Sequence, residues 1–82
     1  MPYIPSYRRE QLKKDAPNCA GDLNYLITDI VNKYINAEGL SYQAINNVIG
    51  ALEGAKLEFY RRVAAPYEDK KINMNGDVYY GI

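Results

Sequence analysis

The sequence segment that decides the fold runs Leu23-Asn-Tyr-Leu-Ile-Thr-Asp-Ile-Val-Asn-Lys-Tyr-Ile35. Its apolar residues recur at intervals of three and four, which places them on one face of an α-helix. Asp22 precedes them, where a helix N-terminus favours negative charge, and Gly39 suits the position that follows a last helical turn. The pattern therefore predicts a helix over residues 22–37.

A second and longer apolar pattern starts after Ser41, which we expect to cap a helix over residues 42–65. Its apolar face is predicted to comprise Tyr42, Ile45, Val48, Ile49, Leu52, Ala55, Phe59 and Val63. Only residues 39–41 connect the two helices, and so short a connection favours antiparallel neighbours. Pro66 either ends or kinks this helix, because it lacks an N–H, or occupies the first turn of a new short helix.

The two ends of the chain have sequences typical of extended structure. Pro2 and Pro5 disfavour a helix in residues 1–5, and Ser6 is the expected N-cap of a short helix over residues 7–14. At the other end, Asn75-Gly76-Asp77 predicts a turn, and residues 78–80 an extended piece. The expected fold is thus all-α, with one small domain over residues 1–82. It is an antiparallel helical hairpin (22–37 and 42–65) with a short N-terminal helix and extended, proline-bearing termini.

The composition excludes several classes of protein. The 82 residues contain no histidine and one cysteine, Cys19, so histidine-dependent catalysis, internal disulfides and thiolate metal clusters are excluded within one chain. Ten basic and ten acidic residues give zero net charge, which argues against general nucleic-acid binding. No segment approaches the roughly 20 apolar residues of a membrane span. We therefore expect a non-enzymatic protein with no cofactor, no metal and no membrane partner, and the lone cysteine suits the cytoplasm.

Small residues gather at one place in the longer predicted helix, at Gly50, Ala51 and Gly54. Each glycine lowers helix stability by about 1 kcal/mol relative to alanine, so their presence indicates close approach by another helix. That helix is either the other long helix of the same chain or a helix of a second copy. Because two helices of this size bury little on their own, we predict Gly50, Ala51 and Gly54 as an oligomer interface.

Basic and aromatic residues form two clusters, one beside the N-terminal arm and one in and after the longer helix. The predicted ligand-binding residues are Tyr7, Arg8, Arg9, Lys56, Tyr60, Arg61, Arg62 and Tyr67. Guanidinium groups suit phosphates, and flat aromatic faces suit nucleobases. If the arm folds over the longer helix, both clusters line one pocket. The alternatives are that Glu58 and Arg62 form a solvated helix salt bridge, and that the tyrosines at helical spacing belong to the core or are half-buried, namely Tyr25, Tyr34, Tyr42 and Tyr60.

Six segments carry a further similarity. They are Met1-Pro-Tyr-Ile-Pro5, Gly21-Asp-Leu-Asn-Tyr25-Leu-Ile-Thr28, Leu40-Ser-Tyr42-Gln, Ile49-Gly-Ala-Leu-Glu-Gly-Ala-Lys-Leu-Glu-Phe-Tyr-Arg-Arg-Val63, Ala65-Pro-Tyr-Glu-Asp-Lys-Lys-Ile72 and Asn75-Gly-Asp-Val-Tyr79. In these segments the chain resembles a family of short proteins from tailed phages and from bacterial or metagenomic sequence. That family has no settled function. The resemblance implies a phage accessory protein, for host takeover or counter-defence, in the cytoplasm of the infected bacterial host.

Two functional hypotheses follow from these features. In the first, the protein is a homo-oligomer that binds and sequesters a small nucleotide-type ligand, such as a host immune signal. In the second, it is a protein–protein interaction module that binds a host or phage protein. The second would use the face of Gly50 and Gly54 or the tyrosine-rich termini.

Overall fold

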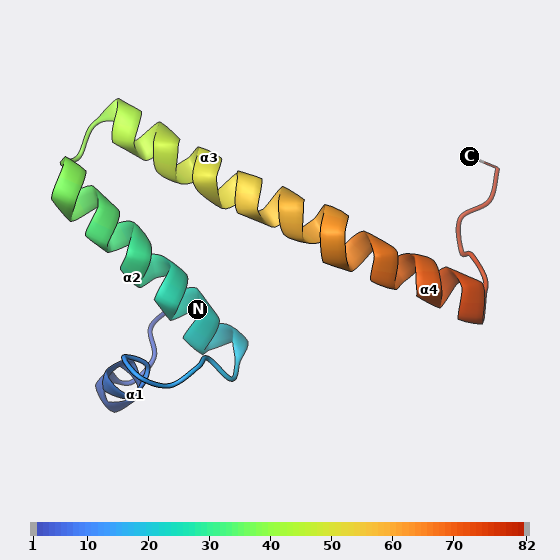
Figure 1. Cartoon of the computed structure of the whole chain (residues 1–82), viewed down its shortest axis with the longest axis horizontal. Helices are drawn as coiled ribbons and strands as arrows, with labels where there is room; N and C mark the ends of the chain where they lie inside the picture. Colours follow the sequence, from blue (N-terminus) through green and yellow to red (C-terminus); the bar gives the residue numbers. More distant parts are fainter. Residues whose placement is uncertain (1, 82) are drawn as a thin grey trace. The chain divides into compact units, whose positions relative to one another are not determined.

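The computed structural model describes residues 2–81, which contain helices and no strand (Figure 1). In chain order the elements are α1 (Ser6–Gln11), α2 (Ala20–Glu38), α3 (Tyr42–Phe59), a π-helical turn called η1 (Tyr60–Ala64) and α4 (Ala65–Asn75). The predicted all-α class is confirmed. Met1 and Ile82, which belong to the predicted extended termini, lie outside the described residues.

The chain divides into two units, and the division falls inside α3. The N-terminal unit is Met1–Ile45 and the C-terminal unit is Asn46–Ile82. The antiparallel pairing predicted for the two long helices concerns both units and stays a prediction. Within residues 2–81, no helix combines the length and the apolar character that a membrane span requires.

Helix α2 begins two residues earlier than its charge pattern predicts, because Cys19 caps it. The backbone at Cys19 is extended, and its Sγ accepts a hydrogen bond from the N–H of Asp22 at 3.4 Å. At the other end, Gly39 has a φ of 86° and donates its N–H to the carbonyl of Ile35 at 2.8 Å. A positive φ suits glycine best, so the predicted position of Gly39 after the last turn is confirmed, and α2 extends to Glu38, one residue beyond its predicted end.

Helix α1 differs from its prediction at both ends. Pro5 is the N-cap and Ser6 is the first helical residue, so the expected Ser6 cap is wrong. The Pro5 carbonyl accepts the N–H groups of Arg8 and Arg9 at 3.0 and 3.1 Å. The helix ends at Gln11 rather than at residue 14. Beyond it the chain continues in tight turns, in which the N–H of Lys13 donates to the carbonyl three residues before it.

The path from α3 into α4 shows how the chain accommodates Pro66. Ser41 caps α3 as predicted, since its Oγ accepts the N–H of Ala44 at 3.0 Å. Pro66 does not end the helical path but lies in the first turn of α4, which is the second of the predicted alternatives. In η1, the N–H of Ala65 donates to the carbonyl of Tyr60, five residues back. We attribute this wider turn to Pro66, whose ring would crowd the carbonyl of Arg62 in a regular α-helix.

The predicted turn at the end of α4 is present. Gly76 has a φ of 90° and donates its N–H to the carbonyl of Ile72 at 2.8 Å. The carboxylate of Asp77 then accepts the N–H of Tyr79 at 2.9 Å. Residues 78–80 form no strand, in accord with an extended tail.

Burial differs sharply between the two units. The buried residues of the described chain are Leu12, Asp22 and Ala44, all in the N-terminal unit. No described residue of the C-terminal unit, 46–81, is buried. The C-terminal unit is therefore a long helical segment whose apolar side chains have no core of their own.

Candidate functional site

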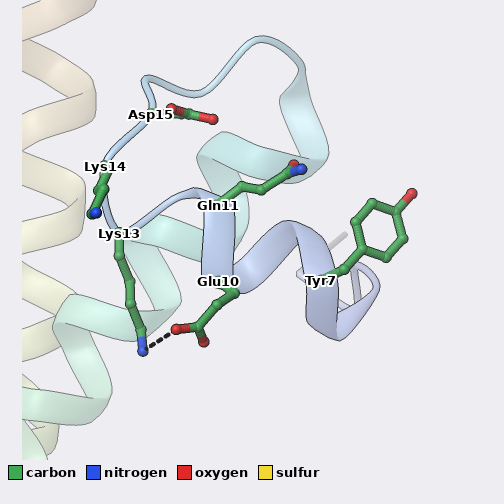
Figure 2. A pocket seen from close by; sticks show the side chains of 6 residues that line it. All are labelled: Tyr7, Glu10, Gln11, Lys13, Lys14 and Asp15. Carbon is green, nitrogen blue, oxygen red and sulfur yellow. Dashed lines mark hydrogen bonds and ion pairs between the residues drawn. The ribbon is translucent and has the colours of Figure 1, made fainter.

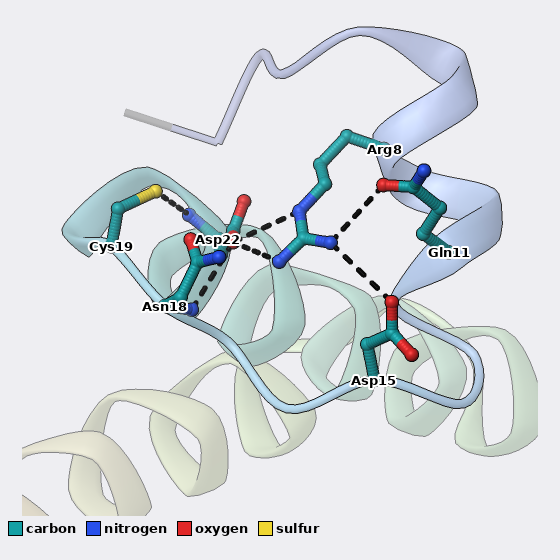
Figure 3. Close-up of polar contacts among 6 residues, drawn as sticks. All are labelled: Arg8, Gln11, Asp15, Asn18, Cys19 and Asp22. Atoms are coloured by element: carbon teal, nitrogen blue, oxygen red, sulfur yellow. Dashed lines mark hydrogen bonds and ion pairs between the residues drawn. The ribbon is translucent and has the colours of Figure 1, made fainter.

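A polar cluster of the N-terminal unit joins Arg8 on α1 to Asp22 on α2 (Figure 3). The Nε and Nη2 atoms of Arg8 donate to Oδ2 of Asp22 at 3.0 and 2.6 Å. The same carboxylate oxygen accepts the N–H of Asn18 at 3.2 Å. Arg8 also donates from Nη1 to Gln11 at 3.1 Å and lies 3.7 Å from a carboxylate oxygen of Asp15. We call this set the arginine lock.

The arginine lock is partly withdrawn from water. The side chain of Asp22 is 3% exposed and that of Arg8 is 17% exposed. The hydrogen bonds from Arg8 lower the pKa of Asp22 below its ordinary value, and the partner carboxylate raises the pKa of Arg8. Because a buried carboxylate needs a hydrogen-bonded counter-charge, Arg8 is committed to Asp22. The structure thus gives this predicted phosphate-binding residue a structural partner inside the N-terminal unit.

Arg9 lies in a different setting from its neighbour. Its Nε donates to the carbonyl of Ile4 at 2.9 Å, and its guanidinium carbon lies 5.5 Å from the centre of the Tyr25 ring. This cation–π contact places Arg9 at an open groove between α1 and α2. The groove, called here the α1–α2 groove, is lined by Arg9, Leu12, Lys13, Tyr25, Leu26, Asp29 and Lys33.

Tyr7 is exposed and lines a shallow open hollow on the other side of α1 (Figure 2). The remaining lining is charged or amide-bearing, including an ion pair of 2.8 Å between Lys13 and Glu10. That carboxylate raises the pKa of Lys13. Figure 2 shows the Tyr7 ring directed away from this ion pair.

The predicted basic residues of the C-terminal unit pair locally along the helix. Lys56 lies 3.5 Å from Glu53, while Arg61 and Arg62 lie 2.8 and 3.6 Å from one oxygen of Glu58. The predicted Glu58–Arg62 salt bridge is therefore present, with Arg61 as an additional partner. All these side chains are exposed, so each pair contributes little to stability.

The two predicted tyrosines of the C-terminal unit are also exposed. The Tyr67 ring lies under the ammonium of Lys71, at 5.5 Å. Tyr60 lines an open groove between the end of the helix and the tail, together with Ile72 and Tyr79. Both rings are more than half exposed, so the alternative that Tyr60 belongs to the core or is half-buried does not fit this structure.

The structure thus brings Tyr7, Arg8 and Arg9 together on α1 but gives each a separate environment. The other predicted ligand-binding residues, from Lys56 to Tyr67, belong to the C-terminal unit. A pocket shared by both clusters stays a prediction.

The predicted small-residue interface lies in the C-terminal unit, within α3. A Cβ added at Gly50 or Gly54 would meet no heavy atom within 4 Å. The expectation that the other long helix of the same chain approaches these glycines concerns both units and stays a prediction. An interface with a second copy at Gly50, Ala51 and Gly54 stays a prediction.

The sequence reasoning missed the residues that line the α1–α2 groove with Arg9. Tyr25, Asp29 and Lys33 follow one another at intervals of four, which places them along one face of α2. That spacing identifies a common face of α2 from the sequence alone. The face lines a groove only because α1 lies beside it. No group of three or more Cys, Asp or Glu side chains within residues 2–81 is arranged to hold a metal ion.

These features define a small all-α protein. Its N-terminal unit contains the arginine lock, and no described residue of its C-terminal unit is buried. The chain belongs to the family described as Domain of unknown function (DUF6899), which matches residues 1–78. Neither a curated protein nor a solved structure gives a significant match.

Proposed function

We propose that the protein is a non-enzymatic interaction module that binds a second copy of itself through the C-terminal helix. The observation that supports this proposal is the absence of burial along residues 46–81. The apolar stripe of this helix is the set Ile49, Leu52, Phe59 and Val63. These side chains are between 42% exposed, at Leu52, and 63% exposed, at Phe59.

The apolar stripe has the geometry of a helix–helix contact surface. Its residues are separated by three, seven and four positions, which keeps them on one side of the helix. Gly50 and Gly54 each lie two residues from Leu52, about 200° around the helix, and so face the opposite side. The proposed contact surface therefore differs from the small-residue interface that the sequence predicted.

A second copy is the occupant that the energetics favour. Completing the burial of four side chains that are about half exposed contributes about 3–6 kcal/mol per copy. A second copy presents the same stripe, so burial of apolar side chains stabilises the complex from both sides. With a polar partner, only this chain would contribute apolar burial. Association itself costs roughly 4–15 kcal/mol, so we expect an equilibrium that depends on concentration.

The charge of the C-terminal unit is compatible with self-association. Five basic residues and five acidic residues lie in residues 46–82, so two copies meet without net repulsion. Three of the basic side chains form exposed local pairs with Glu53 or Glu58, and the other two, Lys70 and Lys71, lie in the middle of α4.

The biological setting of this module comes from the sequence resemblance. Similarity to short phage proteins supports an accessory role in host takeover or counter-defence, in the cytoplasm of an infected bacterium. Sequestration of a nucleotide-type ligand by the oligomer stays a prediction. Lys56, Arg61 and Arg62 form local ion pairs with glutamates, and this pairing does not support a ligand site in the C-terminal unit.

Sedimentation velocity of wild-type protein and two variants tests the proposal. We expect wild type to associate with rising concentration, and Leu52→Glu to remain monomeric because it places a charge in the stripe. Leu57→Glu is the matched control, since Leu57 is 57% exposed and lies about 140° from Leu52. It should associate like wild type.

Two results would contradict this proposal. One is a wild-type protein that stays monomeric at every concentration. The other is equal loss of association in Leu52→Glu and Leu57→Glu, which would indicate a general effect of charge. A monomer that binds a purified host or phage protein through Leu52 would replace the second copy by that partner.

A further inference from the structure

The α1–α2 groove concentrates positive charge in a chain whose net charge is zero. Three basic side chains line it, from Arg9, Lys13 and Lys33, against the single carboxylate of Asp29. The groove is lined by residues of the N-terminal unit and includes Leu12, one of the two apolar residues that are buried within residues 2–81. Its local charge therefore favours an anion.

Arg9 is held in place before any ligand binds. Its hydrogen bond to the Ile4 carbonyl uses Nε, and the guanidinium lies over the ring of Tyr25. A guanidinium fixed in this way presents a fork of donors at little further loss of side-chain entropy. Such a fork matches the oxygens of a phosphate group.

The two lysines can change partner at low cost. Lys13 pairs with Glu10 at 2.8 Å and Lys33 pairs with Asp29 at 3.1 Å, and both lysines are exposed. Exposed pairs of this kind contribute about 0–1 kcal/mol. A phosphate carries more charge than one carboxylate, so it competes well for both ammonium groups.

We propose that the α1–α2 groove binds a phosphate-bearing small molecule with a flat ring, the chemistry of a nucleotide. The groove has a volume of about 370 Å³, which lies within the range of small-molecule sites. Arg9, Lys13 and Lys33 hold the phosphates, and the half-buried ring of Tyr25 offers an aromatic surface beside them. This site is independent of the apolar stripe.

Titration of isotope-labelled protein followed by NMR tests this site with three probes: inorganic pyrophosphate, ATP and adenosine. We expect ATP and pyrophosphate to shift the backbone amides of Arg9, Lys13, Tyr25 and Lys33. Adenosine alone should bind far more weakly because it lacks the phosphates. Lys33→Gln should weaken ATP binding about tenfold, as expected for the loss of one charge-assisted contact.

Lys56→Gln is the matched control, because it removes the same charge from the C-terminal unit and should leave ATP binding unchanged. Leu52→Glu should also leave it unchanged, which separates this site from self-association. The proposal is overturned if neither pyrophosphate nor ATP shifts these amides. Equal weakening by Lys56→Gln and Lys33→Gln, or adenosine binding as tightly as ATP, would overturn it as well.

Discussion

Arg8 and Asp22 are 14 residues apart in sequence, yet they form an ion pair whose side chains are only 17% and 3% exposed. The carboxylate of Asp22 lies at the first turn of α2, where the helix N-terminus also favours negative charge. Arg8 therefore fastens α1 to the start of α2. Arg9, the next residue, is not part of this pair. Its guanidinium lies over the Tyr25 ring and lines the α1–α2 groove.

We predict that the N-terminal unit loses stability in acid because of Asp22. Its pKa in the folded protein is below the ordinary value of 3.8. The carboxylate thus stabilises the fold above pH 3.8, and this contribution is lost as the pH falls through the lower folded-state pKa. Thermal unfolding followed by circular dichroism over a pH series should show the loss, and Asp22→Asn should unfold at lower temperature at neutral pH.

Asp15→Asn provides the control for this prediction. Asp15 also faces Arg8, but at 3.7 Å and with a side chain that is 60% exposed. Its replacement should leave the unfolding temperature nearly unchanged at neutral pH. If Asp15→Asn and Asp22→Asn had the same effect, the arginine lock would not depend on the buried carboxylate.

Among the elements, local signals predict most helix positions, and the exceptions also involve neighbouring residues. The apolar periodicity of α2, the positive φ of Gly39 and the Ser41 cap are all properties of neighbouring residues, and all three are confirmed. Cys19 was missed as a cap because sulfur is a weak acceptor and cysteine is not among the preferred capping residues.

The π-helical turn η1 was beyond the reach of the sequence pattern. The periodicity of the apolar residues is compatible with a regular helix through residue 65. Pro66 predicts that the helix is irregular near this point, but not that the irregularity is a π-helical turn. A wider turn keeps the helical path continuous while it relieves the crowding at Pro66. Arg61 and Arg62 lie in this turn, which sets the directions of their side chains.

The candidate sites were predictable only in part, since they depend on packing between elements. Arg9 was identified from its residue type, but Lys13 and Lys33 join it only because α1 lies beside α2. Arg8 was assigned to a ligand because its partner, Asp22, is distant in sequence. Spacing within one helix could show the face of Tyr25, Asp29 and Lys33, but not what lies opposite it.

We predict that Gly50→Ala and Gly54→Ala each stabilise helix α3, because an added Cβ meets open space. Each replacement should raise helix stability by about 1 kcal/mol. Thermal unfolding of the single and double variants measures this, and sedimentation velocity should show unchanged association. Lower stability together with weaker association would instead place these glycines in a close helix contact between copies.

At the scale of the whole molecule, the two units differ in what stabilises them. The N-terminal unit has a small buried centre and the arginine lock. The C-terminal unit has a long helical segment with exposed Ile49, Leu52, Phe59 and Val63. Because a helix gains most of its stability from packing an apolar face, the proposed second copy would stabilise this segment.

Hydrogen–deuterium exchange of the backbone amides in residues 46–75, measured over a range of protein concentrations, tests the self-association most directly. We predict that exchange of these amides slows as the concentration rises, because burial of the apolar stripe between two copies stabilises the helix. Amides of α2 should change far less. Exchange in residues 46–75 that is independent of concentration would contradict the proposal that a second copy covers the stripe.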